Sequence, residues 1–128
     1  MNAAADIAIG VEPGPEVITG STRLKSGTAQ KMVLNMLSTG AMIRLGKVYG
    51  NLMVDVKPTN EKLVRRAISI VSTAANVSED ESRQALEQCG FSAKTAIVML
   101  TKGLPAQEAE RRLAENGGIV ARALDEED

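Results

Sequence analysis

The 128 residues are 44 % hydrophobic, which suffices for one modest core or two very small ones but not for a large multidomain enzyme. The 15 basic and 16 acidic residues leave a formal net charge of -1, and only Tyr49 and Phe91 are aromatic, so neither a nucleic acid nor a membrane is an expected partner. The chain has no histidine and one cysteine, Cys89, which excludes within these residues a Ser-His-Asp or Cys-His triad, the usual zinc ligand sets and an internal disulfide.

The first predicted elements are a short strand and a loop. Ile7, Ile9 and Val11 alternate with small residues, which is the period of a strand, and the prolines that follow interrupt regular structure. Residues 1–11 have no basic region followed by a long apolar run, so we expect neither secretion nor a membrane span and place the protein in the cytoplasm. Because the strand comes so early, we expect the chain to start in the middle of an α/β fold.

A long helix is predicted over residues 22–45. Apolar side chains recur at helical spacing and fill other faces as well: Ala29, Met32, Val33, Leu34, Met36, Leu37, Ala41, Met42, Ile43 and Leu45. A helix that is apolar nearly all round is buried on most sides. We therefore expect it to be central in the fold or to lie at a subunit interface, and we expect a homo-oligomer.

Residues 46–76 are predicted to form an extended segment and then a helix. Leu52, Val54 and Val56 recur at every second position, as in an extended segment, and Pro58-Thr59-Asn60 is a helix-start signal. The apolar stripe behind this signal consists of Leu63, Val64, Ala67, Ile68, Val71, Ala74 and Ala75. Arg65 and Arg66 then fall on the solvent side of the helix.

Three short helices are predicted after residue 76. Ser78 and Glu81 form a capping box, in which two side chains satisfy free backbone N–H groups at a helix start. Later boundaries carry typical capping and breaking residues: Gly90, Ser92, Gly103, Pro105, Gly117 and Gly118. This bundle resembles a ubiquitin-associated (UBA-like) domain and ends in the acidic residues 125–128. Its apolar residues suffice only for a minimal core, so we expect the bundle to pack against the rest of its protein.

Residues 14–31 combine glycines, hydroxyls and the cations Arg23 and Lys25 just before the long helix. Free N–H groups and the dipole at a helix start favour an anion such as a sugar phosphate or a carboxylate. Alternatively, Ser21 or Thr22 is only an N-cap, and the two cations are solvated charges of the first turn. The local pattern leaves both interpretations open.

The first half of the chain resembles the N-acetylmuramic acid 6-phosphate etherases. The matching motifs are residues 14–16, 19–25, 27–31, 34–37, 40–56 and 58–63. The match runs almost without interruption, which is far more specific than a single short motif. The helical second half fits the C-terminal domain of the same family.

The resemblance implies a sugar isomerase (SIS) domain, an α/β fold with a parallel sheet that binds a sugar phosphate and works as a dimer. It also implies elimination of D-lactate from the C3 ether and addition of water, which gives N-acetylglucosamine 6-phosphate and D-lactate. One carboxylate removes the C2 proton while a carboxylic acid assists the leaving ether, so two glutamates with separated pKa values suit the task. No metal or organic cofactor is implied.

The resemblance places catalysis outside this chain. The two catalytic glutamates of the family and its serine-rich phosphate loops precede the matching segment, so we expect no catalytic residue here and no activity of these residues alone. Glu16 is the one carboxylate in a matching signature, and we expect it to contact substrate rather than to act as the main base. The expected substrate-binding residues are Glu16, Thr19, Ser21, Thr22, Arg23 and Lys25.

We therefore predict a mainly α protein with a remnant strand and a long helix of an SIS domain, followed by a three-helix UBA-like bundle. The predicted parts are an SIS segment over 1–57, a connecting helix over 58–76 and the bundle over 77–128. The predicted function is the C-terminal part of the etherase. The alternative is a non-catalytic sugar-phosphate-binding or oligomerisation module, as in the glucokinase regulatory proteins that share the SIS architecture.

Overall fold

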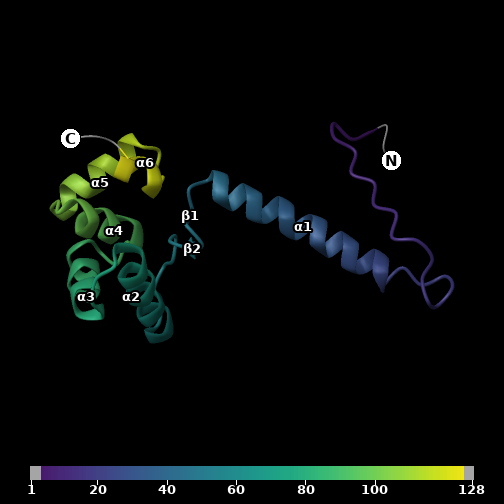
Figure 1. The fold of residues 1–128 in the computed structure, drawn as a ribbon, viewed down its shortest axis with the longest axis horizontal. Helices are drawn as coiled ribbons and strands as arrows, with labels where there is room; N and C mark the ends of the chain where they lie inside the picture. The colour runs from purple at the N-terminus through teal and green to yellow at the C-terminus, as the bar shows by residue number, and fades with distance from the viewer. Residues whose placement is uncertain (1–3, 126–128) are drawn as a thin grey trace. The chain divides into compact units, whose positions relative to one another are not determined.

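The computed structural model describes residues 4–125 and is mainly helical (Figure 1). Six helices and one two-stranded hairpin follow one another in these residues. Contacts group the residues up to Ala41 into one unit and those from Met42 onward into a second. No helix in the described part of the chain is long and apolar enough to cross a membrane.

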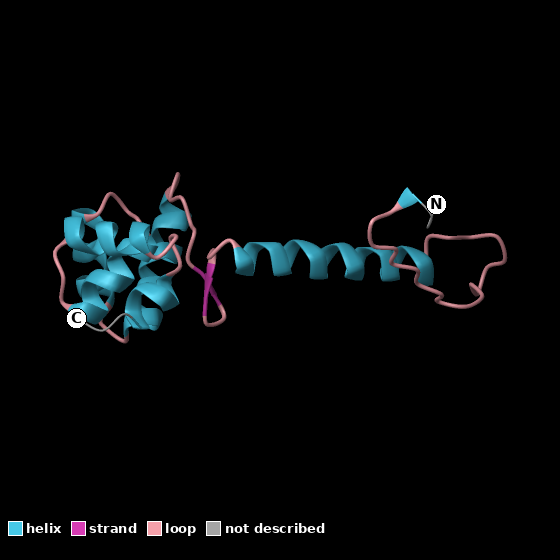
Figure 2. Ribbon diagram, turned by 90° about the horizontal axis from the view of Figure 1, so that it is seen from above, coloured by secondary structure: helices cyan, strands magenta, loops and turns pink. Residues whose placement is uncertain are grey.

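The N-terminal segment is a loop. Residues 5–24 contain no strand, and Figure 2 draws them as loop up to the first long helix. The strand predicted from Ile7, Ile9 and Val11 is therefore wrong for this chain, and the side chain of Ile7 is 82 % exposed. A strand is held by hydrogen bonds to a neighbouring strand, and no other strand pairs with this segment among the described residues.

Helix α1 spans Lys25–Arg44, which confirms the long helix predicted over residues 22–45. None of its residues is buried, and Leu34 and Met36 are 65 % and 63 % exposed. The expected burial is therefore not provided within residues 4–125, which leave the apolar surface of α1 exposed. The homo-oligomer stays a prediction.

Strands β1 (Val48–Tyr49) and β2 (Leu52–Met53) form an antiparallel hairpin, in agreement with the extended segment predicted there. Val48 pairs with Met53, and Tyr49 pairs with Leu52. Gly50 is the first residue of the two-residue turn and has a φ of 56°, the left-handed value that glycine adopts without steric cost in a hairpin turn.

Gly46, just before the hairpin, is buried against the turn after residue 116. A Cβ at this position would lie 2.7 Å from Cγ1 of Ile119 and 3.1 Å from the Gly118 carbonyl oxygen. Gly46 also has a φ of 67°, which disfavours a residue with a side chain. The absence of a side chain thus allows the chain before the hairpin to pack against the turn that precedes the last helix.

Helix α2 spans Glu61–Ala75 and begins where Pro58-Thr59-Asn60 predicts a helix start. The Asn60 side chain accepts a hydrogen bond of 3.0 Å from the Leu63 N–H, which satisfies a free donor of the first turn. Ala67, Ile68, Ile70 and Val71 are buried, and Arg65 is exposed as expected.

Helices α3 (Glu79–Gln88), α4 (Ala93–Lys102) and α5 (Ala106–Glu115) confirm the three short helices, and a fourth, α6 (Val120–Asp125), follows. Ser92 caps α4 through the Thr95 N–H, and Gly103 ends it with a φ of 68°. Residues 126–128 of the predicted acidic tail lie outside the described residues.

Helices α2 to α6 share one core (Figure 1). Leu86 of α3, Ile97 of α4 and Val120 of α6 are fully or almost fully buried in it together with Val71 of α2. We predicted a boundary at residue 57 and a separate connecting helix over 58–76. In the structure α2 packs on α3 and α4 and supplies part of their core.

The capping box of α3 provides a first test of local stability. The Glu81 N–H donates to Ser78 Oγ at 3.2 Å, and the Ser78 N–H donates to Glu81 Oε2 at 2.9 Å. Replacing Ser78 with Ala leaves an N–H of the first turn without its side-chain acceptor, so it should lower the free energy of unfolding by about 1 kcal/mol. Urea denaturation measures the change, and Thr101→Ala at an exposed position in α4 should change stability much less.

Candidate functional site

The loop of residues 17–24 connects the Gly14-Pro15-Glu16 motif to α1. The Ser21 N–H donates to the Ile18 carbonyl oxygen at 3.1 Å, and Gly20 within this turn has a φ of 86°. The Arg23 N–H donates to Ser21 Oγ at 3.3 Å. Both bonds are local, so they shape the loop and bring the hydroxyl of Ser21 close to the backbone of Arg23.

Glu16 caps α1. Its Oε2 accepts a hydrogen bond of 2.9 Å from the Lys25 N–H, and its Oε1 accepts one of 3.0 Å from the Ser26 N–H. The N–H groups of Ser26 and Lys25, with a smaller contribution from the Lys25 ammonium group, lower the pKa of the Glu16 carboxyl group. Glu16 is therefore an ionised carboxylate at neutral pH, placed at the positive end of the helix dipole.

The N-cap interpretation of Ser21 or Thr22 is wrong. The helix begins at Lys25, and its first N–H groups are satisfied by a carboxylate that lies nine residues earlier in the chain. The helix start was also expected to receive the anion of a substrate. In the structure the N–H groups of Lys25 and Ser26 are occupied by the chain's own anion.

The six expected binding residues lie close together in sequence around this capped turn. The side chains of Thr19, Thr22, Arg23 and Lys25 are exposed, and those of Glu16 and Ser21 are partly buried. An open hollow of about 630 Å³ lies beside Arg23 and Lys25 and continues along the helix to Met32. Two cations and three hydroxyl groups are thus exposed or partly exposed at the N-terminal end of α1.

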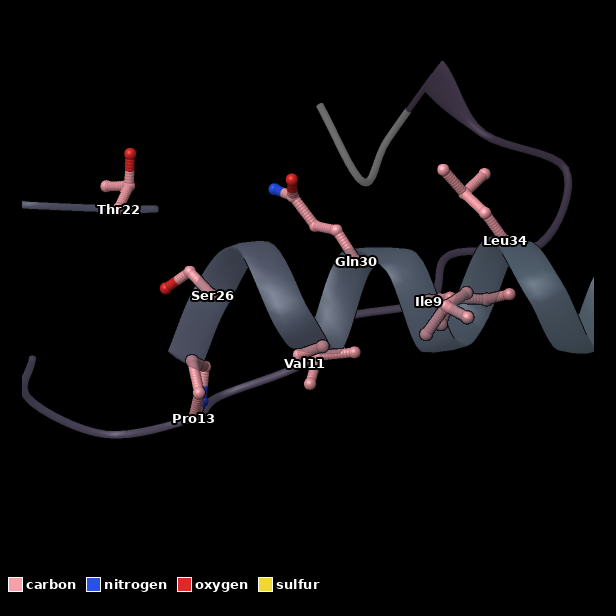
Figure 3. A pocket seen from close by; sticks show the side chains of 9 residues that line it. Ile9, Val11, Pro13, Thr22, Ser26, Gln30 and Leu34 are labelled. Atoms are coloured by element: carbon pink, nitrogen blue, oxygen red, sulfur yellow. The ribbon is translucent and has the colours of Figure 1, made fainter. Parts of the chain in front are cut away.

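A second cavity, of about 490 Å³, lies between the N-terminal segment and the first turns of α1. Figure 3 shows Ile9, Val11 and Pro13 on the N-terminal segment, which runs alongside α1. The side chains of Ser26 and Gln30 project from α1. Its lining residues are Ile9, Val11, Pro13, Thr22, Ser26, Ala29, Gln30, Val33 and Leu34. The lining is mostly apolar, and Thr22 is the one expected binding residue in it.

The second unit, from Met42 onward, is called the helical unit below. It contains a polar cluster that the sequence analysis did not predict. Asp55 pairs with Lys47 at 2.9 Å and with Lys94 at 3.9 Å, and Lys94 Nζ donates to the Gly118 carbonyl oxygen at 3.0 Å. The hydrogen bond from Lys47, together with the nearby lysine charges, lowers the pKa of Asp55. Asp55 and Lys94 line a cavity of about 450 Å³ between residues 54–59 and 90–94.

Neither a metal site nor a reactive thiol is evident in residues 4–125. Within this range no three His, Cys, Asp or Glu residues come together in a way that could hold a metal ion. The Cys89 side chain is half-buried, and burial raises the pKa of its thiol, which keeps the thiol protonated at neutral pH. Its Sγ donates a hydrogen bond of 3.3 Å to the Ser92 carbonyl oxygen.

Comparison with known proteins identifies two kinds of relative. Residues 50–95 match the model of the C-terminal lid domain of glucokinase regulatory protein. Proteins named N-acetylmuramic acid 6-phosphate etherase match nearly the whole chain. The protein from Cutibacterium acnes (strain DSM 16379 / KPA171202) is 56 % identical over 98 % of the chain, and that from Klebsiella aerogenes is 57 % identical over 97 %.

A third relative with the same name, from Aliivibrio fischeri (strain MJ11), is 55 % identical over 99 % of the chain. The resemblance to this family seen in the sequence motifs is therefore confirmed. The chain spans 41 % of the length of the first two relatives and 42 % of the third.

Proposed function

We propose that this chain is the C-terminal portion of a carbon–oxygen lyase that cleaves the D-lactyl ether of N-acetylmuramic acid 6-phosphate. The identity of 55 to 58 % to etherases, extended over 94 to 99 % of the chain, is the observation that carries the proposal. A similarity of this level covers the loop, α1, the hairpin and the helical unit together. The protein is proposed to be cytoplasmic, and the exposed apolar surface of α1 is proposed to lie against other parts of a dimer.

The reaction has two stages. A base removes the C2 proton, the C3–O bond breaks, and the lactate leaves with a proton from a general acid. Water then adds across the resulting double bond, with hydroxide at C3 and a proton at C2, which yields N-acetylglucosamine 6-phosphate. The acid and the base are two glutamates in the part of the enzyme that this chain does not contain, so its own residues bind and orient the substrate.

The binding role is assigned to the segment around the capped turn. The Arg23 guanidinium and the Lys25 ammonium are exposed cations that can make charge-assisted hydrogen bonds to phosphate oxygens or to the lactyl carboxylate. Thr19, Ser21 and Thr22 supply hydroxyl groups beside them. Glu16 begins this segment and is joined to its other end by two hydrogen bonds to the first turn of α1.

A second candidate function is a non-catalytic module. The match of residues 50–95 to the C-terminal lid domain of glucokinase regulatory protein favours it. These residues contain strand β2 of the hairpin, α2, α3 and the start of α4, and they supply part of the shared core. In this alternative, the chain binds a sugar phosphate or a partner without cleaving an ether.

A chimaera separates the two candidates. Residues 1–128 replace the matching 41 % of the Klebsiella aerogenes protein, and the product is assayed with N-acetylmuramic acid 6-phosphate. Release of D-lactate supports the etherase. A folded chimaera that binds the sugar phosphate and releases no lactate supports the non-catalytic module.

The two cations give a kinetic prediction in this chimaera. Changing both Arg23 and Lys25 to Ala should raise KM at least about tenfold, because each charge-assisted bond to an anion contributes about 1.5–3 kcal/mol. The melting temperature should stay nearly constant, because both side chains are exposed. A matched control, the double change of Arg65 and Arg83 to Ala, removes two exposed cations from α2 and α3 and should leave KM unchanged. An unchanged KM with a strong loss of thermal stability in the first variant would show that its cations are structural.

A further inference from the structure

We propose that Glu16 is a positioning residue, whose ionised carboxylate ties residues 17–24 to the first turn of α1 and thereby assembles the binding segment. This inference rests on the proposed function, which assigns substrate binding to this segment. It assigns to Glu16 a different role from the substrate contact expected from the sequence.

The geometry carries this role. The two oxygens of one carboxylate accept hydrogen bonds from the N–H groups of two successive residues, Lys25 and Ser26, at 2.9 and 3.0 Å. These bonds close the loop of eight residues, 17–24, that separates Glu16 from Lys25. Two other hydrogen bonds of loop residues 17–24, from Ser21 N–H to Ile18 and from Arg23 N–H to Ser21, remain inside the loop. At the end of the loop, the Leu24 carbonyl oxygen accepts hydrogen bonds from the N–H and the hydroxyl group of Thr28 in α1. The Glu16 carboxylate therefore fixes the start of the loop to the helix that its other end directly precedes.

The charge of Glu16 also limits where a substrate anion can bind. A phosphate group placed at the first N–H groups of α1 would meet a carboxylate that already accepts their hydrogen bonds. Repulsion between like charges disfavours that position. Arg23, two residues before the helix, and Lys25, its first residue, are exposed cations beside this turn and can hold the anion instead.

The role requires the ionised form of the side chain. A glutamine in the same place offers one carbonyl oxygen to one N–H, while its NH₂ group faces the second N–H as a donor. Protonation of the glutamate has a similar effect. Because the pKa of Glu16 is lowered by Ser26 and Lys25, the closed loop is fully formed above the ordinary pKa of a glutamate and is lost as the pH falls through the lowered value. Lys25 is the charged group that acts on this carboxylate, and it favours the ionised form.

The test uses the whole chain, labelled with ¹⁵N, and needs no ligand in its first stage. In the wild-type chain the amide resonances of Lys25 and Ser26 should shift together as the pH is lowered, with a midpoint below the ordinary pKa of a glutamate. In Glu16→Gln that transition should be absent, and the amides of residues 17–24 should show faster exchange with solvent. Glu12→Gln removes an exposed carboxylate of the same segment and should retain the transition. Unchanged resonances of the α2–α6 core in both variants show that the chain remains folded.

The second stage titrates N-acetylglucosamine 6-phosphate at neutral pH and follows residues 19–25. Glu16→Gln should weaken binding at least about tenfold, Glu16→Asp should recover part of the affinity, and Glu12→Gln should match the wild type. If Glu16→Gln weakens binding while the loop amides remain as in the wild type, Glu16 contacts the ligand directly and the positioning role is wrong. A loosened loop with unchanged affinity would contradict the role as well.

The two stages separate this inference from the proposed function. A pH transition at Lys25 and Ser26 without any binding of the sugar phosphate would contradict the proposed binding segment while supporting the capping contact. Absence of the transition would overturn the inference, even in a chain that binds the sugar phosphate.

Discussion

Residues 1–128, purified alone, are expected to release no D-lactate from N-acetylmuramic acid 6-phosphate above the uncatalysed background. The reaction needs a base at C2 and an acid at the ether oxygen, and each such group typically contributes about 10²–10⁴ in rate. The chain has no histidine to serve in either role. Glu16 is the carboxylate of the binding segment, and its N–H partners lower its pKa, which makes it a weak base at neutral pH.

The measurement is an enzymatic assay of D-lactate with the purified chain. The Glu16→Gln variant and the intact Klebsiella aerogenes protein are assayed for comparison. Neither form of the chain should give a signal. Lactate release by the unmodified chain, together with its loss in Glu16→Gln, would make Glu16 a catalytic base. That result would contradict both the assignment of catalysis to the rest of the enzyme and the positioning role of Glu16.

A fragment of residues 76–128 is expected to lack a cooperative unfolding transition, whereas residues 42–128 should unfold cooperatively. The shorter fragment lacks α2, whose Ala67, Ile68, Ile70 and Val71 are buried in the core shared with α3 to α6. Burial of one Val or Ile side chain contributes about 1.5–3 kcal/mol. The summed contribution of Ile68, Ile70 and Val71 is therefore comparable with the whole free energy of unfolding of a small domain, about 5–15 kcal/mol.

Thermal unfolding of both fragments, followed by circular dichroism, measures this difference. Within residues 42–128, Ile68→Ala should lower the free energy of unfolding by about 2–5 kcal/mol, because it leaves a cavity in the core. Ser69→Ala, at an exposed position of the same helix, is the matched control and should change little. A cooperative, high-temperature transition of residues 76–128 would show that the helices after α2 form a core of their own.

The helical unit was largely predictable because its signals are local. Asn60, the Ser78 and Glu81 pair, Ser92 and Gly103 each mark a helix end within a few residues of the backbone groups that they satisfy. The apolar spacing in residues 63–75 predicted the buried face of α2. That this face belongs to the core of α3 to α6 depends on packing between helices, which local spacing does not specify.

The N-terminal part was less predictable because its structure depends on distant groups. Alternation at residues 7–11 indicated a strand, but a strand also needs a neighbour, and none pairs with it in the described structure. The helix start was misplaced because Glu16, rather than Ser21 or Thr22, provides the cap from nine residues away. Asp55 and Lys94 likewise meet only in the folded chain.

The measurement that tests the central proposal most directly is the rate of D-lactate release by the chimaera in which this chain replaces the matching part of the Klebsiella aerogenes etherase. If these residues are the corresponding portion of an etherase, kcat should lie within about tenfold of the parent enzyme, a difference of about 1.4 kcal/mol in activation free energy. A chimaera with the secondary structure and oligomeric state of the parent enzyme that binds N-acetylmuramic acid 6-phosphate but releases no lactate would contradict the proposal.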